Sequence, residues 1–132
     1  HLPNNDILSA TRLLTNVHTD SLNALTVLLC GNEHLPRRFG LSALESLASA
    51  ITVSVPVEPL SKEETFSYVE SRLSDCGANS PLLTANALAL IHQASGGTMR
   101  TIGTITTAAL RRAWMSKSTQ VEAEHVQAVL TR

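Results

Sequence analysis

The chain has 132 residues, a net charge of −1, 43% apolar residues and 16% charged residues. This length is that of one domain with a hydrophobic core, and the composition excludes a disordered segment. The nearly balanced charge excludes a global electrostatic field directed at nucleic acid or a membrane. Only 3% of the residues are aromatic, so we expect a core of aliphatic side chains.

The cysteines and histidines form no recognisable ligand or disulfide pattern. Cys30 and Cys76 stand alone, and the five histidines include no pair at ligand spacing. We therefore expect no metal site, and a reduced intracellular protein. The longest apolar run, residues 25–30, is too short to cross a bilayer, so we expect no membrane insertion by this segment. Because the chain begins at His1 rather than Met, we expect a fragment or a processed product.

The first half of the chain predicts short helices around two strands. A helix should begin near Asp6, residues 33–39 form a short helix broken at Pro36, and residues 41–48 repeat at helical spacing. The apolar positions of these helices are Ile7, Ala10, Leu14, Leu41, Leu44, Leu47 and Ala48.

Two stretches between these helices predict strands. Residues 25–30 are continuously apolar and end at Gly31, as in parallel strands buried on both faces. Residues 51–55 alternate, are β-branched and end at Pro56. The fold expected here is part of a doubly wound α/β sheet, too small to be complete.

From Val57 onward the pattern is entirely helical. Ser61 and Glu64 form a capping box that opens a helix ending at Gly77, and three further helices follow. The three further helices cover residues 84–94, about 98–117, and from about 122 onward. The apolar positions of all four helices are Phe66, Val69, Leu73, Ala87, Leu88, Ile91, Ala94, Met99, Ile102, Ile105, Ala109, Ala113, Val126, Val129 and Leu130. Four helices with short loops predict an all-α bundle, which gives two domains, 1–57 and 58–132, and a mostly α chain.

The connection before the third of these helices is the most informative stretch. Gly96 and Gly97 supply positive φ angles for a close turn, and Thr98 is a candidate N-cap. Arg100 then falls in the first turn, where the helix dipole disfavours a cation. An arginine at this position is explained if an anion binds there. The alternative is an ordinary solvated arginine.

Two other groups of polar residues are candidates for binding. Asn32 follows the first expected strand, and ligands of open α/β sheets bind outside the carboxyl ends of strands; the alternative is an ordinary turn asparagine. Arg111, Arg112 and Lys117 lie in a stretch without acids, and they suit contact with DNA phosphates; the alternative is a solvated helix face.

The ordered set of motifs resembles the second half of an AAA+ ATPase of the ExeA-like family, which includes secretion-pathway A proteins and TniB/MuB-type transposition helpers. The stretches that carry the resemblance are His1-Leu2, as the end of a Walker B box, Leu13-Leu14-Thr15-Asn16, Leu28-Leu29-Cys30-Gly31-Asn32, Glu58-Pro59-Leu60-Ser61, Glu64-Thr65, Leu88-Ala89-Leu90-Ile91-His92-Gln93-Ala94-Ser95 and Gly96-Gly97-Thr98-Met99-Arg100.

The resemblance implies roles for individual residues. Asn32 falls at sensor 1, a catalytic position that contacts the γ-phosphate or the attacking water, and Arg100, after Gly96 and Gly97, falls at sensor 2. Ala50 occupies the position of the family's arginine finger. Arg37 or Arg38 could substitute for it, or they are surface charge. Met99 and Thr101-Ile102-Gly103 depart from the usual sensor 2 residues, which implies a degenerate form of the site.

The resemblance also implies cofactors and partners. ATP and Mg would bind the parent protein, but the phosphate loop and Walker B acids would precede His1, so we expect no tight nucleotide binding and no hydrolysis by this chain alone. Without the intervening strand we expect self-association or a rearranged sheet. The partners implied are DNA with a transposase, or a secretion assembly, in the bacterial cytoplasm. The alternative is a non-catalytic helical interaction or DNA-binding module.

Overall fold

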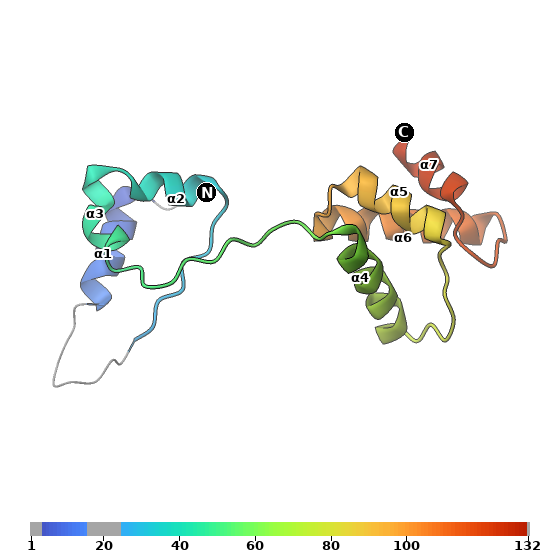
Figure 1. The fold of residues 1–132 in the computed structure, drawn as a ribbon, viewed down its shortest axis with the longest axis horizontal. Coiled ribbons are helices and arrows are strands. Elements are labelled where there is room, and N and C mark those ends of the chain that lie inside the picture. The colour runs from blue at the N-terminus through green and yellow to red at the C-terminus, as the bar shows by residue number, and fades with distance from the viewer. Residues whose placement is uncertain (1–3, 16–24, 132) are drawn as a thin grey trace. The chain divides into compact units, whose positions relative to one another are not determined.

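The structure, a computed structural model, describes residues 4–15 and 25–131. The chain divides into two compact units: an N-terminal unit, residues 1–56, and a helical unit, residues 57–132. In chain order (Figure 1) the described elements are α1 (Asn5–Thr15), α2 (His34–Phe39), the 3₁₀ helix η1 (Ser42–Leu44), α3 (Glu45–Ala48), α4 (Lys62–Asp75), α5 (Ala85–Ser95), α6 (Met99–Met115) and α7 (Ala123–Leu130).

The N-terminal unit is built around four buried leucines. Leu8 of α1, Leu35 of α2, Leu44 of η1 and Leu47 of α3 form one cluster, against which Leu29 and Phe39 pack. The periodicity placed the apolar face of α1 on the wrong residues. Ile7 is 59% exposed, whereas Leu8 is buried. The side chain of Leu14 and residues 1–3 lie outside the described part of the chain.

Pro36 does not break α2. The helix begins at His34, so Pro36 is its third residue, within the first turn. A backbone N–H in that turn has no acceptor inside the helix, so proline removes nothing that the helix needs. The prediction of a break at Pro36 was therefore wrong, although a helix does cover this stretch.

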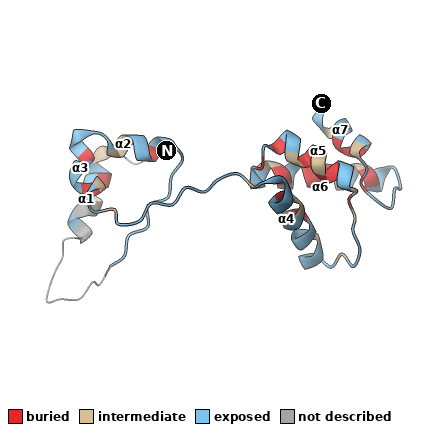
Figure 2. Ribbon diagram, viewed as in Figure 1, coloured by how far each residue is buried: buried red, intermediate tan, exposed pale blue. Residues whose placement is uncertain are grey.

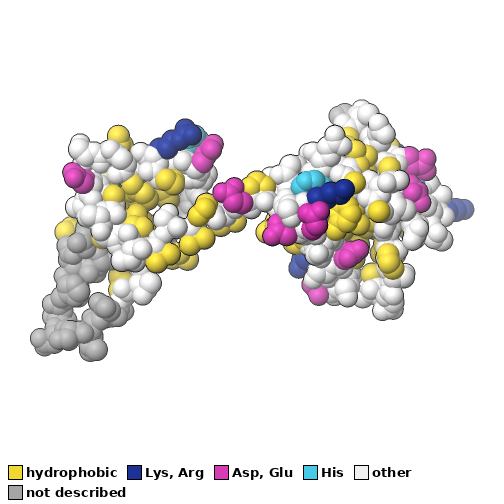
Figure 3. Space-filling view, in the orientation of Figure 1, with side chains coloured by type: hydrophobic (Ala, Val, Ile, Leu, Met, Phe, Trp, Pro, Cys, Tyr) yellow, Lys and Arg dark blue, Asp and Glu magenta, His cyan; other side chains and the backbone are white. Residues whose placement is uncertain are grey.

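The two predicted strands are irregular chain in the structure. Neither 25–30 nor 51–55 is a strand, and the described residues contain only an isolated parallel bridge between Leu83 and Val121. A β-strand requires a hydrogen-bonded neighbour, and neither stretch has one among the described residues. Most of their apolar side chains are consequently exposed (Figure 3): Leu28 is 84% and Val55 74% exposed, whereas Leu29 is half-buried against the leucine cluster.

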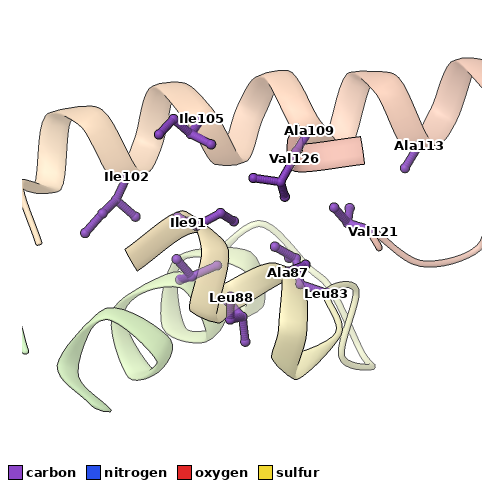
Figure 4. Packing of buried hydrophobic residues seen from close by; sticks show 11 residues of the cluster. Leu83, Ala87, Leu88, Ile91, Ile102, Ile105, Ala109, Ala113, Val121 and Val126 are labelled. Carbon is purple, nitrogen blue, oxygen red and sulfur yellow. The ribbon is translucent and has the colours of Figure 1, made fainter. Parts of the chain in front are cut away.

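The helical unit has a larger, continuous core. Helix α6 packs against α4, α5 and α7, and α5 packs against α4 and α7. Figure 2 shows the buried residues of these helices facing one another, and in Figure 4 the side chains of α5 and α6 meet. The buried members are Val69, Leu83, Ala87, Leu88, Ile91, Ile102, Ile105, Ala109, Ala113, Val121 and Val126. The all-α bundle is thus present.

Some positions at the ends of the expected faces are exposed. Met99 is 47% and Leu130 41% exposed, and Ala94 is exposed while its neighbour Ser95 is buried. Between the helices, the Val121 N–H donates to the Leu82 carbonyl at 2.7 Å. This bond ties the loop after α6 to the loop before α5.

The predicted capping box at the start of α4 is confirmed. The Glu64 N–H donates to Ser61 Oγ at 3.2 Å, and the Ser61 N–H donates to Glu64 Oε2 at 2.8 Å. The Ser61 backbone bond, followed by its side-chain bond, lowers the pKa of Glu64 below its ordinary value. The linker, residues 57–60 at the start of the helical unit, is thereby followed by a sharply defined helix start.

Candidate functional site

The turn between α5 and α6 has the conformation that its glycines predict. Gly96 is the C-cap of α5 at φ 57° and ψ 29°, and its N–H donates to the His92 carbonyl at 3.0 Å. Gly97 follows at φ 75°. Two successive residues in this region would strain any L side chain, so glycines are required to turn the chain into α6.

Gly97 also makes a close approach that its sequence did not predict. The Leu60 N–H donates to the Gly97 carbonyl at 2.9 Å. A Cβ atom on Gly97 would lie 2.2 Å from the Leu60 carbonyl oxygen, whereas a Cβ on Gly96 would meet nothing within 4 Å. The sequence hinted at this approach only through the second of the two consecutive glycines, because a single glycine suffices to cap a helix.

Arg100 lies in the first turn of α6 and is exposed. No acidic residue shares this turn, and the N-cap Thr98 makes no side-chain capping bond. The first helical bond runs from the Ile102 N–H to the Thr98 carbonyl at 2.9 Å. The N–H groups of residues 99–101 therefore have no acceptor among the described residues. These N–H groups and the guanidinium of Arg100 together make the N-terminus of α6 positive, and such a helix end is suited to binding an anion.

Asn32 has a definite local role in the structure. Its Oδ1 accepts from the His34 N–H at 3.1 Å, and its carbonyl accepts from the Leu35 N–H at 3.0 Å. This is the turn asparagine of the alternative interpretation, opening α2. The bond to Oδ1 orients the amide, and Nδ2 makes no hydrogen bond to another described residue, so it can still donate to a ligand.

The two candidates for an arginine finger differ. Arg38 is half-buried and its Nη2 donates to Asn5 Oδ1, which joins α2 to the start of α1. Arg37 is exposed, and its guanidinium makes no ion pair or hydrogen bond to another described residue, although its carbonyl accepts from the Gly40 N–H. Ala50 is exposed in the turn after α3. Of the two arginines, Arg37 is therefore the better candidate for contact with a neighbouring subunit, because its guanidinium is not engaged within the N-terminal unit.

The basic residues at the end of α6 do not share one face. Arg111 is exposed, but Arg112, about 100° further round the helix, lines a cavity between α6 and α7 with His125. Lys117 follows the helix at φ 57°. Trp114, between Arg112 and Lys117 in the chain, is 78% exposed, and it was not singled out from the sequence.

His92 is a further polar residue that the sequence did not single out. Its Nδ1 lies 3.0 Å from Thr65 Oγ1, and that hydroxyl donates to the Ser61 carbonyl at 2.8 Å. Since the hydroxyl proton is used for Ser61, His92 Nδ1 is the donor to Thr65. This chain of bonds joins the end of α5 to the start of α4. The sequence feature that could have indicated this role is the position of His92 next to the apolar face of α5.

Together these features define a class: a helical bundle in which a double-glycine turn presents an arginine at a helix start. Among curated proteins, the chain is similar to General secretion pathway protein A of Aeromonas hydrophila, with 36% identity over 115 residues. The match covers 87% of this chain and 21% of that protein, so the chain spans about a fifth of the relative's length. This similarity supports the resemblance to the ExeA-like family. No protein-family model and no solved structure matches.

Within the described part of the chain, no helix is both long and apolar enough to cross a membrane. No three side chains of His, Cys, Asp or Glu gather there in a way that could hold a metal ion.

Proposed function

We propose that the chain is the sensor and lid portion of an ATP-binding AAA+ ATPase of the ExeA-like family, acting as an ATP-dependent switch in a secretion assembly. The observation that carries the proposal is the double-glycine turn, which presents Arg100 together with the unpaired N–H groups of residues 99–101. The similarity to a general secretion pathway protein supports the choice of family and of the secretion branch.

In this proposal Arg100 is the sensor 2 residue. Its guanidinium would neutralise charge on the phosphates, and the positive end of α6 would add to that field. Asn32 would be sensor 1, with Nδ2 donating to the γ-phosphate or the attacking water while Oδ1 stays on His34. ATP and Mg would be held by a phosphate loop and Walker B acids outside this sequence, so this chain alone should bind nucleotide weakly.

The exposed apolar stretches fit the same proposal. Residues 25–30 and 51–55 would be strands of the AAA+ sheet, paired through a strand from the longer protein. Without it, Leu28, Val53 and Val55 stay exposed, which favours self-association. The exposed Arg37 would be the finger offered to the neighbouring subunit, because Arg38 is already bound to Asn5.

The test uses a longer protein that carries this chain with its phosphate loop. Arg100→Ala should lower ATP turnover by about tenfold or more, the usual effect of removing a charge-stabilising group. Arg111→Ala, on the same helix and also exposed, is the matched control and should leave turnover in the absence of DNA unchanged. Unchanged turnover in Arg100→Ala would remove the sensor assignment.

A second candidate is a DNA-binding module of a transposition helper, in which a transposase would be the further partner. One observation favours it: residues 98–121 contain four basic residues and no acid. Salt-sensitive binding to duplex DNA that is lost in Arg111→Ala/Arg112→Ala would support this candidate. Binding that is absent at low salt would exclude it.

A further inference from the structure

We infer that Leu60 and Gly97 form a backbone clamp that fixes the end of the linker to the start of α6, so that Gly97 is a positioning residue for Arg100. The inference goes beyond the proposed function in placing the pivot: movement of the helical unit would occur at residues 57–59, before the clamp. The importance of the clamp for ATP turnover rests on the proposed function, whereas its existence does not.

The first support is the contact itself. The Leu60 N–H reaches the Gly97 carbonyl at 2.9 Å, and the two backbones are so close that a Cβ on Gly97 would overlap both the carbonyl oxygen and the nitrogen of Leu60, at 2.2 and 2.9 Å. Gly97 is buried although it lies in a turn. A glycine needed only for its positive φ would have open space around its Cβ position, as Gly96 and Gly77 do.

The second support is that the neighbouring residue is tied to the same place. The Ser61 carbonyl accepts from Thr65 Oγ1 at 2.8 Å, and that hydroxyl lies 3.0 Å from His92 Nδ1. The His92 carbonyl in turn accepts from the Gly96 N–H. Thr65 is fully buried in this arrangement. Leu60 and Ser61 are thus attached to the end of α5 and to the turn by independent bonds.

The linker just before the clamp is held by nothing comparable. Val57 is 90% exposed, and Glu58 and Pro59 are exposed. The N–H groups of Val57 and Glu58 donate to no other described residue, and Pro59 has no N–H. The backbone thus changes between Pro59 and Leu60 from one without hydrogen bonds to one that is hydrogen-bonded at both Leu60 and Ser61.

A clamp at this point has a consequence for Arg100, which follows Gly97 by three residues. A rotation of the linker at residues 57–59 carries Leu60, the glycine turn and the first turn of α6 as one piece. Arg100 would then move with the linker rather than independently of it. If the clamp opened, the start of α6 and the linker could move separately, and the position of the guanidinium would be less well defined.

The clamp is tested by amide hydrogen exchange on this chain, comparing Gly97→Asn with Gly96→Asn. Asparagine tolerates positive φ, so both variants limit backbone strain, but only the one at position 97 places a Cβ against Leu60. We expect the Leu60 amide to lose protection by about tenfold or more in Gly97→Asn, the loss of one hydrogen bond. It should stay protected in Gly96→Asn. Protection of Ile102 and Ile105 should persist in both, which shows that the bundle is folded.

A second pair of variants covers the case in which Gly97→Asn does not fold. Leu60→Pro removes the N–H that donates to Gly97, while Leu60→Ala keeps it and removes a similar part of the side-chain packing. Gly96 and Gly97 amides should exchange faster in Leu60→Pro than in Leu60→Ala. Equal exchange in the two variants would overturn the clamp, as would wild-type Leu60 exchanging as fast as Val57.

The functional part is measured in the longer protein. Gly97→Asn should lower ATP turnover more than Gly96→Asn does, and Arg100→Ala should add little to Gly97→Asn, because both remove the same positioned group. If Arg100→Ala alone has no effect, the sensor assignment fails but the clamp can still be seen by exchange. If Arg100→Ala slows turnover and Gly97→Asn does not, the positioning role is overturned.

Discussion

Replacing Ile102 by alanine should remove a large share of the stability of the helical unit. Ile102 is fully buried in the cluster where α6 meets α5 (Figure 4), so truncation leaves a cavity that its neighbours fill only in part. Such changes cost about 2–5 kcal/mol, and Ile102→Val about 0.5–1.5 kcal/mol. A unit of this size is expected to have a free energy of unfolding of about 4–11 kcal/mol, so the loss in Ile102→Ala is a large fraction of the total.

The assay is urea denaturation followed by far-ultraviolet circular dichroism, with hydrogen exchange to report on each unit. Met99→Ala is the control: it lies on the same helix and was expected on the same face, but its side chain is 47% exposed, and it should cost well under 1 kcal/mol. Protection around Leu44 should not change, because the core of the N-terminal unit shares no member with that of the helical unit. A cost below about 1 kcal/mol for Ile102→Ala, or equal loss of protection around Leu44, would refute this reasoning.

Three further outcomes follow from individual contacts. Ser61→Ala should lower the free energy of unfolding by about 1 kcal/mol, the usual value of an N-cap, measured by urea denaturation at neutral pH. Since the pKa of Glu64 is lowered by folding, its contribution is present above its ordinary pKa and disappears as the pH falls through the lowered value; Glu64→Gln should flatten the acid limb of the stability profile, and an unchanged limb would contradict the bond. Leu28→Ala should change the stability of this chain by no more than about 0.5 kcal/mol, because Leu28 is 84% exposed, and it should reduce self-association measured by ultracentrifugation.

The helical unit was largely predictable because its signals are local. The capping box at Ser61, the positive φ angles of Gly96 and Gly97, and the burial of Ile102 and Ala109 follow from spacing and backbone chemistry. Periodicity fails at helix ends, where a neighbour covers only part of the face. This is why Met99 and Ala94 are exposed.

Other features depend on partners that a single sequence does not specify. The β-branched run at 51–55 has strand propensity, but a strand forms only beside another strand, and none of the described residues supplies one. The approach of Leu60 to Gly97 joins residues far apart in the chain and involves backbone atoms only, so no side-chain pattern announces it. For the candidate site, the sequence predicted the turns next to Asn32 and before Arg100. That both side chains contact one phosphate group stays a prediction.

A double-mutant cycle on ATP turnover tests the central claim most directly. Asn32→Ala, Arg100→Ala and the double variant are compared with wild type in the longer protein, at saturating ATP. If both side chains act on the same phosphate group, the double variant should be distinctly faster than the product of the two single effects predicts. Two effects that multiply independently, or single variants that turn over ATP at the wild-type rate, would contradict a shared site.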